Sequence, residues 1–314
     1  MTRMGFRAWG PLALWAAATT PAWAQETQAP QDESRFHPAA GVEVWASTDS
    51  DDTDVIKLSG RALWNFEGRD KYQGITVEKA WFKPIGQQTR EDERVYVDLA
   101  DDIGGKWLWK AKVGTDGDTV LGSASVRSAD WKYNLFVERE IIETPIGVDD
   151  GLYYTFVGGS VDLPVNERNV FTVMTGVQEF TGKNERLHLR GTYTHVLKPE
   201  WGLSAQLRGR YYHSTRPYEY DYFSPRDYVE VLPVVQLRRF TDGGWMYLLA
   251  AGYGAQKATY GDWQESRYAD LRIESPVNSR KLNAFLQVQY SNTSITGGPG
   301  YDYVMGRMGV TFAF

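Results

Sequence analysis

The chain ends in YDYVMGRMGVTFAF, residues 301–314, in which apolar and other side chains alternate. Phe314, Phe312, Val310 and Met308 are apolar, and the residues between them are small or polar. A period of two places every second side chain on the same face of a β-strand. A last strand with one apolar face that stops on Phe is typical of a closed outer-membrane barrel. The edge strand of a soluble sandwich also alternates, so the rest of the chain must decide between the two.

The amino-terminal segment has the features of a secretion signal. Arg3 and Arg7 precede a short apolar run, and Ala22-Trp23-Ala24 fits a small-x-small cleavage site. The run is too short to cross a membrane as a helix. The expected division of the chain is a signal peptide over 1–24, a disordered periplasmic lead-in over 25–40, and an outer-membrane β-barrel over 41–314.

The composition excludes several classes of function. The 314 residues include 34 Lys and Arg against 40 Asp and Glu, a net charge of −6, which argues against a nucleic-acid partner. The absence of cysteine excludes disulfides, thiol catalysis and cysteine-bound metal. The 12 Trp, 19 Tyr and 13 Phe are many for a chain of negative mean hydropathy. A barrel combines these properties, because only alternate residues face lipid while aromatic residues ring both membrane interfaces.

Turn-rich segments divide the chain into strands of regular spacing. The sequence predicts an all-β fold, a closed antiparallel transmembrane barrel of about sixteen strands within a range of roughly 14–18. The expected strands are 42–47, 55–66, 74–84, 93–100, 107–114, 119–128, 131–140, 152–163, 168–180, 185–197, 201–214, 227–240, 245–258, 263–275, 281–293 and 301–314.

The connections between these strands differ in length in a way that favours a membrane barrel. Joins after even-numbered strands, such as 166–167 and 198–200, are short and rich in turn residues. Several odd joins, including 144–151 and 215–226, are longer, whereas the even join 67–73 is an exception. With both termini in the periplasm, the long connections face the outside.

The alternation also predicts which charged side chains line the lumen. Strand 185–197 puts Leu187 and Leu189 on one face and Arg186 and Arg190 on the other, and a charged lining requires a water-filled interior. The charges either neutralise one another in a narrow bore or form a track for a hydrated cargo. The predicted pore-lining residues are a basic wall of Arg186, Arg190, Arg208, Arg210 and Arg238 and the acids Glu138, Glu140, Asp162, Glu230, Asp270 and Glu274.

Catalytic and metal-binding arrangements find little support. His213 and Ser214 are adjacent, so on a strand they point to opposite faces and cannot act as base and nucleophile. His188 and His195 are seven positions apart and equally unable to share a metal. The acidic run 49–54 is interpreted as a solvated outer loop, with weak cation binding as the alternative. No enzyme activity, cofactor or metal is therefore expected.

The connection TRPYEYDYFSPRDY, residues 215–228, carries a cluster of aromatic rings. Rings beside acids suit stacking against a sugar chain, and the alternative is an aromatic girdle at the membrane interface. The segment 222–228 resembles the Tyr-Phe-Ser-Pro-x-x-Tyr segment in the barrel of the cellulose-synthase export subunit. More loosely, the whole chain resembles the barrels of exopolysaccharide exporters, including the poly-N-acetylglucosamine porin. The residues expected to stack on sugar are Tyr218, Tyr220, Tyr222, Phe223 and Tyr228.

The resemblance implies passive export of an exopolysaccharide across the outer membrane of a Gram-negative bacterium. Those exporters usually carry a periplasmic tetratricopeptide arm, and this sequence shows no such repeat. If the likeness holds, a separate periplasmic repeat-containing scaffold protein supplies the arm. The other expected partners are the polysaccharide cargo, membrane lipids and the barrel-assembly machinery. Phe312 and Phe314 resemble the terminal signal that this machinery recognises.

Two other classes of function remain alternatives at this point. The first is a diffusion porin for small solutes, and the second is an outer-membrane hydrolase or a structural barrel. A porin is expected to fold a long loop into its bore, and no connection here much exceeds about 14 residues, which favours export.

Overall fold

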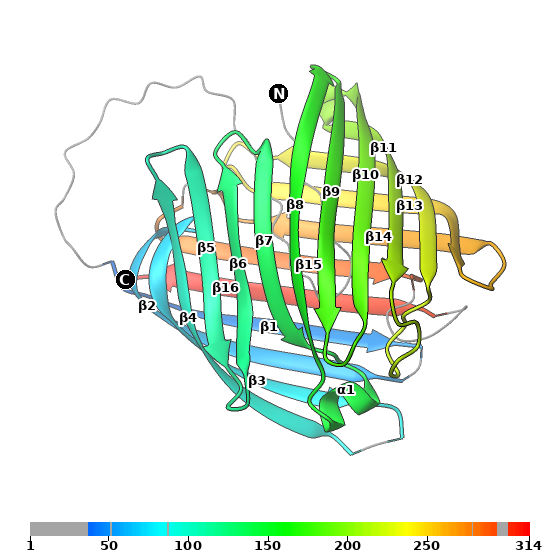
Figure 1. Cartoon of the computed structure of the whole chain (residues 1–314). Coiled ribbons are helices and arrows are strands. Elements are labelled where there is room, and N and C mark those ends of the chain that lie inside the picture. Colours follow the sequence, from blue (N-terminus) through cyan, green and yellow to red (C-terminus); the bar gives the residue numbers. More distant parts are fainter. Residues whose placement is uncertain (1–36, 51, 87, 278, 294–300) are drawn as a thin grey trace.

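The protein is a closed barrel of sixteen antiparallel strands, in which each strand pairs with its sequence neighbours and β1 closes on β16. The computed structural model describes residues 37–50, 52–86, 88–277, 279–293 and 301–314. Figure 1 shows β1 and β16, at opposite ends of the colour scale, running side by side. The predicted all-β barrel of about sixteen strands is confirmed. The predicted signal peptide and most of the predicted lead-in lie outside the described residues.

The strands are long enough to cross a membrane when tilted. β1 is longer than predicted at both ends, because its whole length pairs with β2 and β16. Among the described residues, no helix is long and apolar enough to cross a membrane. The elements are β1 (Ala39–Asp49), β2 (Asp54–Gly68), β3 (Lys71–Lys83), β4 (Arg90–Ile103), β5 (Trp107–Thr115), β6 (Val120–Ser128), β7 (Tyr133–Ile141), α1 (Pro145–Asp149), β8 (Tyr153–Asn166), β9 (Asn169–Phe180), β10 (Glu185–Lys198), η1 (Pro199–Trp201), β11 (Leu203–Ser214), β12 (Asp227–Phe240), β13 (Met246–Ala258), β14 (Gln264–Glu274), β15 (Leu282–Ser291) and β16 (Tyr303–Ala313).

The connections at the two ends of the barrel differ as the sequence predicts. The end that holds the start of β1 and the end of β16 has short joins, whereas 142–152, 215–226 and 292–302 connect strands at the other end. The even join 67–73, which the sequence predicts to be an exception because of its length, is also short in the structure. β2 continues to Gly68 and β3 begins at Lys71, which leaves only 69–70 as the turn. Gly68 has a φ of 140° at an irregularity in the β2–β3 register, a conformation that favours glycine.

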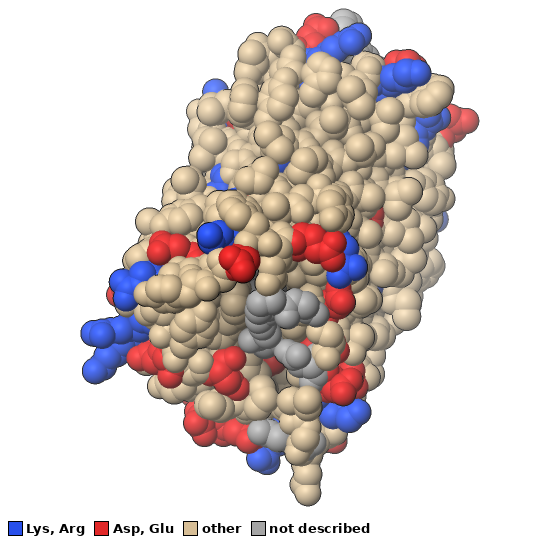
Figure 2. Space-filling model, turned by 90° about the vertical axis from the view of Figure 1, so that its right-hand side faces the viewer, with Lys and Arg blue, Asp and Glu red and all other residues tan. Residues whose placement is uncertain are grey.

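The strand faces match the predicted alternation. On β11, Leu207 is 49% exposed and Gln206 is 4% exposed, so Leu207 lies on the lipid face and Gln206 in the lumen. Met308 and Phe312 of β16 are likewise exposed, whereas Arg307 is buried inside the barrel. Figure 2 shows a broad uncharged surface in its upper middle part, with charged groups at the upper end and over the lower half of the view. This distribution suits a barrel surrounded by lipid with polar groups at both membrane surfaces.

The lumen contains more apolar side chains than the sequence predicts. Phe136, Phe156, Phe180 and Met174 point inward from β7, β8 and β9 and form a buried cluster. Phe136 and Phe156 meet edge to face at 5.3 Å between ring centroids. The alternation correctly predicts that these residues face inward, but it does not predict that they fill one side of the interior. The bore is therefore partly packed with side chains.

Candidate functional site in the barrel lumen

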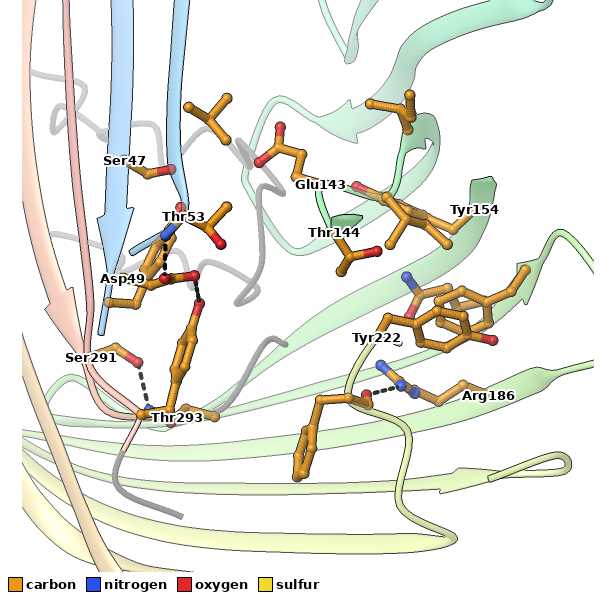
Figure 3. Close-up of a pocket in the computed structure, with 18 of the residues that line it drawn as sticks. Ser47, Asp49, Thr53, Glu143, Thr144, Tyr154, Arg186, Tyr222, Ser291 and Thr293 are labelled. Carbon is orange, nitrogen blue, oxygen red and sulfur yellow. Dashed lines mark hydrogen bonds between the residues drawn. The ribbon is translucent and has the colours of Figure 1, made fainter. Parts of the chain in front are cut away.

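The interior of the barrel contains two main cavities, one toward each end. The cavity near the long connections, here called the outer cavity, has a volume of about 110 Å³. Figure 3 shows Arg186 and Tyr222 on one side of it, opposite Asp49, Ser291 and Thr293. The inner cavity, near the short turns, has a volume of about 200 Å³ and is lined mainly by charged side chains of β1–β7.

An ion pair stands between the two cavities. Lys57 lines the inner cavity and Glu143 lines the outer cavity. The Lys57 Nζ atom lies 2.6 Å from Glu143 Oε1 and 3.8 Å from Glu140 Oε2. Because Glu143 belongs to the 142–152 connection, this contact ties an outer loop to the barrel wall and narrows the path between the cavities.

The lumen wall formed by β2–β7 carries a network of paired charges, here called the paired wall. Arg94 has a fully buried side chain and lies within 2.6–3.3 Å of carboxylate oxygens of Asp92, Glu140 and Glu78. Arg61 pairs with Asp98 at 2.9 Å in the same wall. Arg94 and Asp98 are not among the pore-lining residues predicted from the sequence. Alternation along β2–β4 was the signal that could have found them.

The predicted acids also face the lumen, and each of them contacts groups outside the predicted basic wall. Glu140 contacts Arg94, and Glu274 lies 2.6 Å from Arg69 Nη2. Asp270 lies 2.5 Å from Arg272 Nη2. The three others accept hydrogen bonds from hydroxyl groups: Glu138 from Tyr154, Asp162 from Thr172, and Glu230 from Ser266 and Thr293.

The five arginines of the predicted basic wall all point inward but do not form one uniform surface. Arg208 donates to Gln206 Oε1 at 2.8 and 2.9 Å and lies over the ring of Tyr268. Arg238 lies near the short-turn end, 5.3 Å from the ring centroid of Phe240. Arg186, Arg190 and Arg210 lie on the neighbouring strands β10 and β11, and Arg186 and Arg210 line the outer cavity.

Arg186 is held between two aromatic rings. Its Cζ atom lies 4.9 Å from the ring centroid of Phe180 and 4.4 Å from that of Tyr212. Its Nη2 donates to the carbonyl oxygen of Phe223 at 2.6 Å, and its Nε donates to Ser214 Oγ at 3.2 Å. Arg186 therefore anchors the 215–226 connection to the lumen wall.

Arg190 and Arg210 have a different environment. They are direct cross-strand partners on β10 and β11. The Nε, Nη1 and Nη2 atoms of Arg190 and the Nε and Nη1 atoms of Arg210 are buried and find no hydrogen-bond partner in the described part of the chain. His188, on the same face of β10, has its Nε2 3.0 Å from Gln178 Oε1, while its buried Nδ1 has no such partner. Among the described residues, these three neighbouring side chains together have six buried nitrogen atoms without a hydrogen-bond partner.

The 215–226 connection folds inward over the outer cavity. Tyr222 is 4% exposed and stacks on Phe180 with ring centroids 4.5 Å apart. Its Oη accepts a hydrogen bond from Asn184 Nδ2, and burial raises the pKa of its phenol. Asp221 accepts hydrogen bonds from Thr144 Oγ1 at 2.6 Å and from the Ile146 backbone at 2.7 Å. A connection of ordinary length thus reaches the outer cavity, so the lengths of the connections do not by themselves separate an exporter from a porin.

The five rings predicted to stack on sugar occupy different environments. Tyr228 is buried and stacks on Tyr212 with ring centroids 4.8 Å apart. The ring faces of Tyr228 and Tyr222 are therefore already covered by other rings of the protein. Tyr218 is 57% exposed, and Tyr220 packs against the apolar cluster of the lumen. Phe223 lines the outer cavity. Phe223 and Tyr218 are thus the rings best placed to meet a ligand.

Two predicted separations of side chains are seen in the structure. His213 pairs with Asp227 at 2.9 Å, whereas Ser214 accepts a hydrogen bond from Arg186 in the lumen. His195 lies near Asn169 Oδ1, and His188 faces the lumen. No group of three potential metal ligands occurs within the described ranges. The predicted recognition residues Phe312 and Phe314 lie on the lipid side, with ring centroids 6.1 Å apart.

The turn at 69–70 closes the inner cavity with another charge cluster. Asp70 lies 2.8 Å from Lys110 Nζ and 2.9 Å from Arg127 Nη2. Burial disfavours the charged carboxylate, but attraction to Lys110 and Arg127 outweighs burial and lowers the pKa of Asp70 to about 2. This carboxylate connects the β2–β3 turn to β5 and β6.

Comparison with known proteins identifies the fold. No protein-family model and no curated protein matches the sequence. A bacterial polysaccharide outer membrane secretin matches with a TM-score of 0.61 at 12% identity, over 88% of this chain and 98% of that chain. OprD of Pseudomonas aeruginosa matches with a TM-score of 0.42 at 11% identity, over 89% and 95% of the two chains. The match to the polysaccharide secretin shows the fold, a closed outer-membrane type of barrel, and the predicted resemblance to a polysaccharide-exporter barrel is confirmed at the level of the fold.

Proposed function

We propose that the protein is a passive outer-membrane channel through which a Gram-negative bacterium exports an exopolysaccharide. The observation that carries this proposal is the outer cavity, where the ring of Phe223 lies beside the cationic side chains of β10 and β11. A sugar presents C–H groups that pack on aromatic faces and hydroxyl groups that accept hydrogen bonds from guanidinium groups. A cavity that offers both suits a hydrated carbohydrate chain.

Two further features support this function. The polar groups of the channel wall are distributed along the bore, in both the outer and the inner cavity. A polymer that moves through a channel needs many weak contacts rather than one tight site. The matching polysaccharide secretin shares the barrel architecture over nearly its whole length. We place the cargo, the barrel-assembly machinery, membrane lipids and a periplasmic repeat-containing scaffold among the partners of this channel.

A diffusion porin for small solutes is the second candidate, and one observation favours it. The 215–226 connection folds inward and is held by Asp221 and Arg186, so it narrows the outer end of the lumen. A constriction of this kind selects small solutes by size and charge. Export of a polymer requires that this connection move aside or that the chain pass beside it.

A gene deletion tests the proposal directly. The deletion strain is expected to lose extracellular polysaccharide, measured as total sugar in the matrix, and a plasmid-borne wild-type copy is expected to restore it. Phe223→Ala should restore less, because it removes the ring that lines the outer cavity. Tyr253→Ala is the matched control, since Tyr253 is 65% exposed on the outer surface of the barrel. Full extracellular polysaccharide in the deletion strain would exclude export, and slower uptake of small solutes in that strain would then support the porin.

A further inference from the structure

Arg190 and Arg210 place two positive charges opposite each other on neighbouring strands. The two residues are partners in the β10–β11 register, where like charges are destabilising. Single nitrogen atoms without a partner also occur on Arg94, Arg127 and Arg272, but those arginines have carboxylate partners. Arg190 differs because all three guanidinium nitrogens are buried without a partner in the described part of the chain.

The acidic side chain nearest in the strand register does not neutralise this pair. Glu230 lies opposite Arg210 on β12. Its Oε1 accepts hydrogen bonds from Ser266 Oγ at 2.6 Å and Thr293 Oγ1 at 2.9 Å. Within the described residues, no ion pair of 4.0 Å or less joins Glu230 to either arginine. The hydroxyl groups instead hold the carboxylate on the β12–β14 side of the lumen.

The neighbouring groups add donors and positive charge on the same face. Arg186 lies between Phe180 and Tyr212, and the rings of Tyr212 and Tyr228 lie 5.6 and 5.2 Å from Arg210 Cζ. The rings orient the guanidinium groups without accepting their in-plane hydrogen bonds. The described residues thus leave these buried donors of Arg190 and Arg210 without acceptors, in a partly apolar surrounding.

A buried guanidinium group without a counter-charge costs stability, and a polar or apolar residue of similar size would avoid that cost. A carboxylate offers two oxygen atoms that match the planar donor fork of arginine, so a pair of unpaired arginines is well suited to bind one. Phe223, which lines the outer cavity together with Arg186 and Arg210, supplies an aromatic face for the sugar ring that carries the carboxylate.

We propose that Arg190 and Arg210, assisted by His188 and Arg186, form a lumen site for the carboxylate groups of an acidic polysaccharide. This inference rests on the proposed export function and names the chemical class of its cargo, a chain that contains uronic acid residues. Successive carboxylates bind the site and leave it as the chain advances, because no single contact has to hold the polymer permanently.

Block of single-channel current by oligosaccharides tests the site on the purified full-length barrel in planar bilayers. The probes are a galacturonate hexamer and, as the neutral control, maltohexaose. We expect the uronate hexamer to block wild-type current at a concentration about tenfold lower or more, since bidentate charge-assisted contacts contribute well over 1 kcal/mol in free energy. In the Arg190→Gln/Arg210→Gln double variant, the two hexamers should block the current at nearly equal concentrations.

Arg239→Gln is the control for the loss of one positive charge and is matched to the single variants Arg190→Gln and Arg210→Gln. Arg239 is exposed near the short-turn end and donates to the backbone oxygen of Glu200, outside the proposed site. This variant should keep the preference for the uronate hexamer. Equal block of the wild type by both probes would overturn the proposal, as would an unchanged preference in the double variant. If the double variant does not assemble, each single glutamine variant should show a reduced preference, and an unchanged preference in both would overturn the site.

The outcomes also separate this inference from the export function. A deletion strain that keeps its polysaccharide would exclude export, while uronate-selective block would still establish the acid site in a porin. A deletion strain that loses its polysaccharide, together with equal block by both probes, would keep export and exclude the acid site.

Discussion

On the paired wall, Arg94 lies against Glu78, Asp92 and Glu140, whereas on the facing strands Arg190 and Arg210 lie against each other. Both sets of arginines are buried in the same lumen and come from strands with the same alternation. They differ in what surrounds them. The first set has carboxylate partners from neighbouring strands, and the second has aromatic rings and another arginine.

This difference teaches which charges hold the barrel together and which are available for binding. Removing one partner of a buried ion network leaves an uncompensated charge and destabilises the protein. Removing an unpaired buried charge relieves a desolvation cost instead. Residues that reduce stability are often retained because they serve function. The sign of the change in stability therefore distinguishes the two walls experimentally.

The largest effect is expected for Arg94→Gln on the paired wall. The substitution leaves the carboxylates of Glu78, Asp92 and Glu140 without their shared cation, so the free energy of unfolding should fall by about 3–5 kcal/mol. Urea unfolding of the barrel in phospholipid vesicles, followed by tryptophan fluorescence, measures this loss. A loss below 1 kcal/mol would mean that the network does not stabilise the barrel.

A charge added on either face of β11 tests whether the lumen wall that contains Arg190 and Arg210 lines a hydrated bore. Leu207→Arg puts the charge into lipid near the middle of the strand and should cost about 2–4 kcal/mol. Gln206→Arg puts it into the lumen and should cost much less. The same unfolding measurement applies, and equal losses would contradict the assignment of the faces.

The Asp70 cluster at the short-turn end should give an effect of intermediate size. The pKa of Asp70 is about 2, below its ordinary value of 3.8, so the ionised carboxylate stabilises the folded barrel at neutral pH by about 2 kcal/mol at most. This contribution should be fully present above the ordinary pKa and be lost as the pH falls through about 2. Asp70→Asn should remove it, and a stability difference between wild type and variant that is the same at pH 7 and pH 2 would contradict this assignment.

The smallest change, and the only one of opposite sign, is expected for Arg190→Gln. Because the guanidinium group has no hydrogen-bond or ion-pair partner among the described residues, the variant should gain about 1 kcal/mol in unfolding free energy. Thermal loss of the folded, gel-shifted form in detergent provides the measurement. Destabilisation comparable to that of Arg94→Gln would show that Arg190 belongs to a structural network.

The sequence alone determined the fold and the direction of nearly every side chain. Terminal alternation, turn-rich joins and an aromatic-rich but polar composition predicted a closed barrel of about sixteen strands, because a strand has only two faces and a membrane requires one of them to be apolar. The inward direction of Arg190 and of Glu230 followed from the same period. These properties are local, so no knowledge of distant contacts was needed.

Only the tertiary structure decided which inward charges meet. The pairing of Arg94 with Glu140 joins β4 to β7, and that of Arg69 with Glu274 joins residues 205 positions apart. The inward fold of 215–226 likewise depends on Asp221 reaching the 142–152 connection. Such contacts depend on the closure and curvature of the barrel across its bore. Alternation along a strand carries no information about the opposite wall, and so the unpaired arginines became visible only in three dimensions.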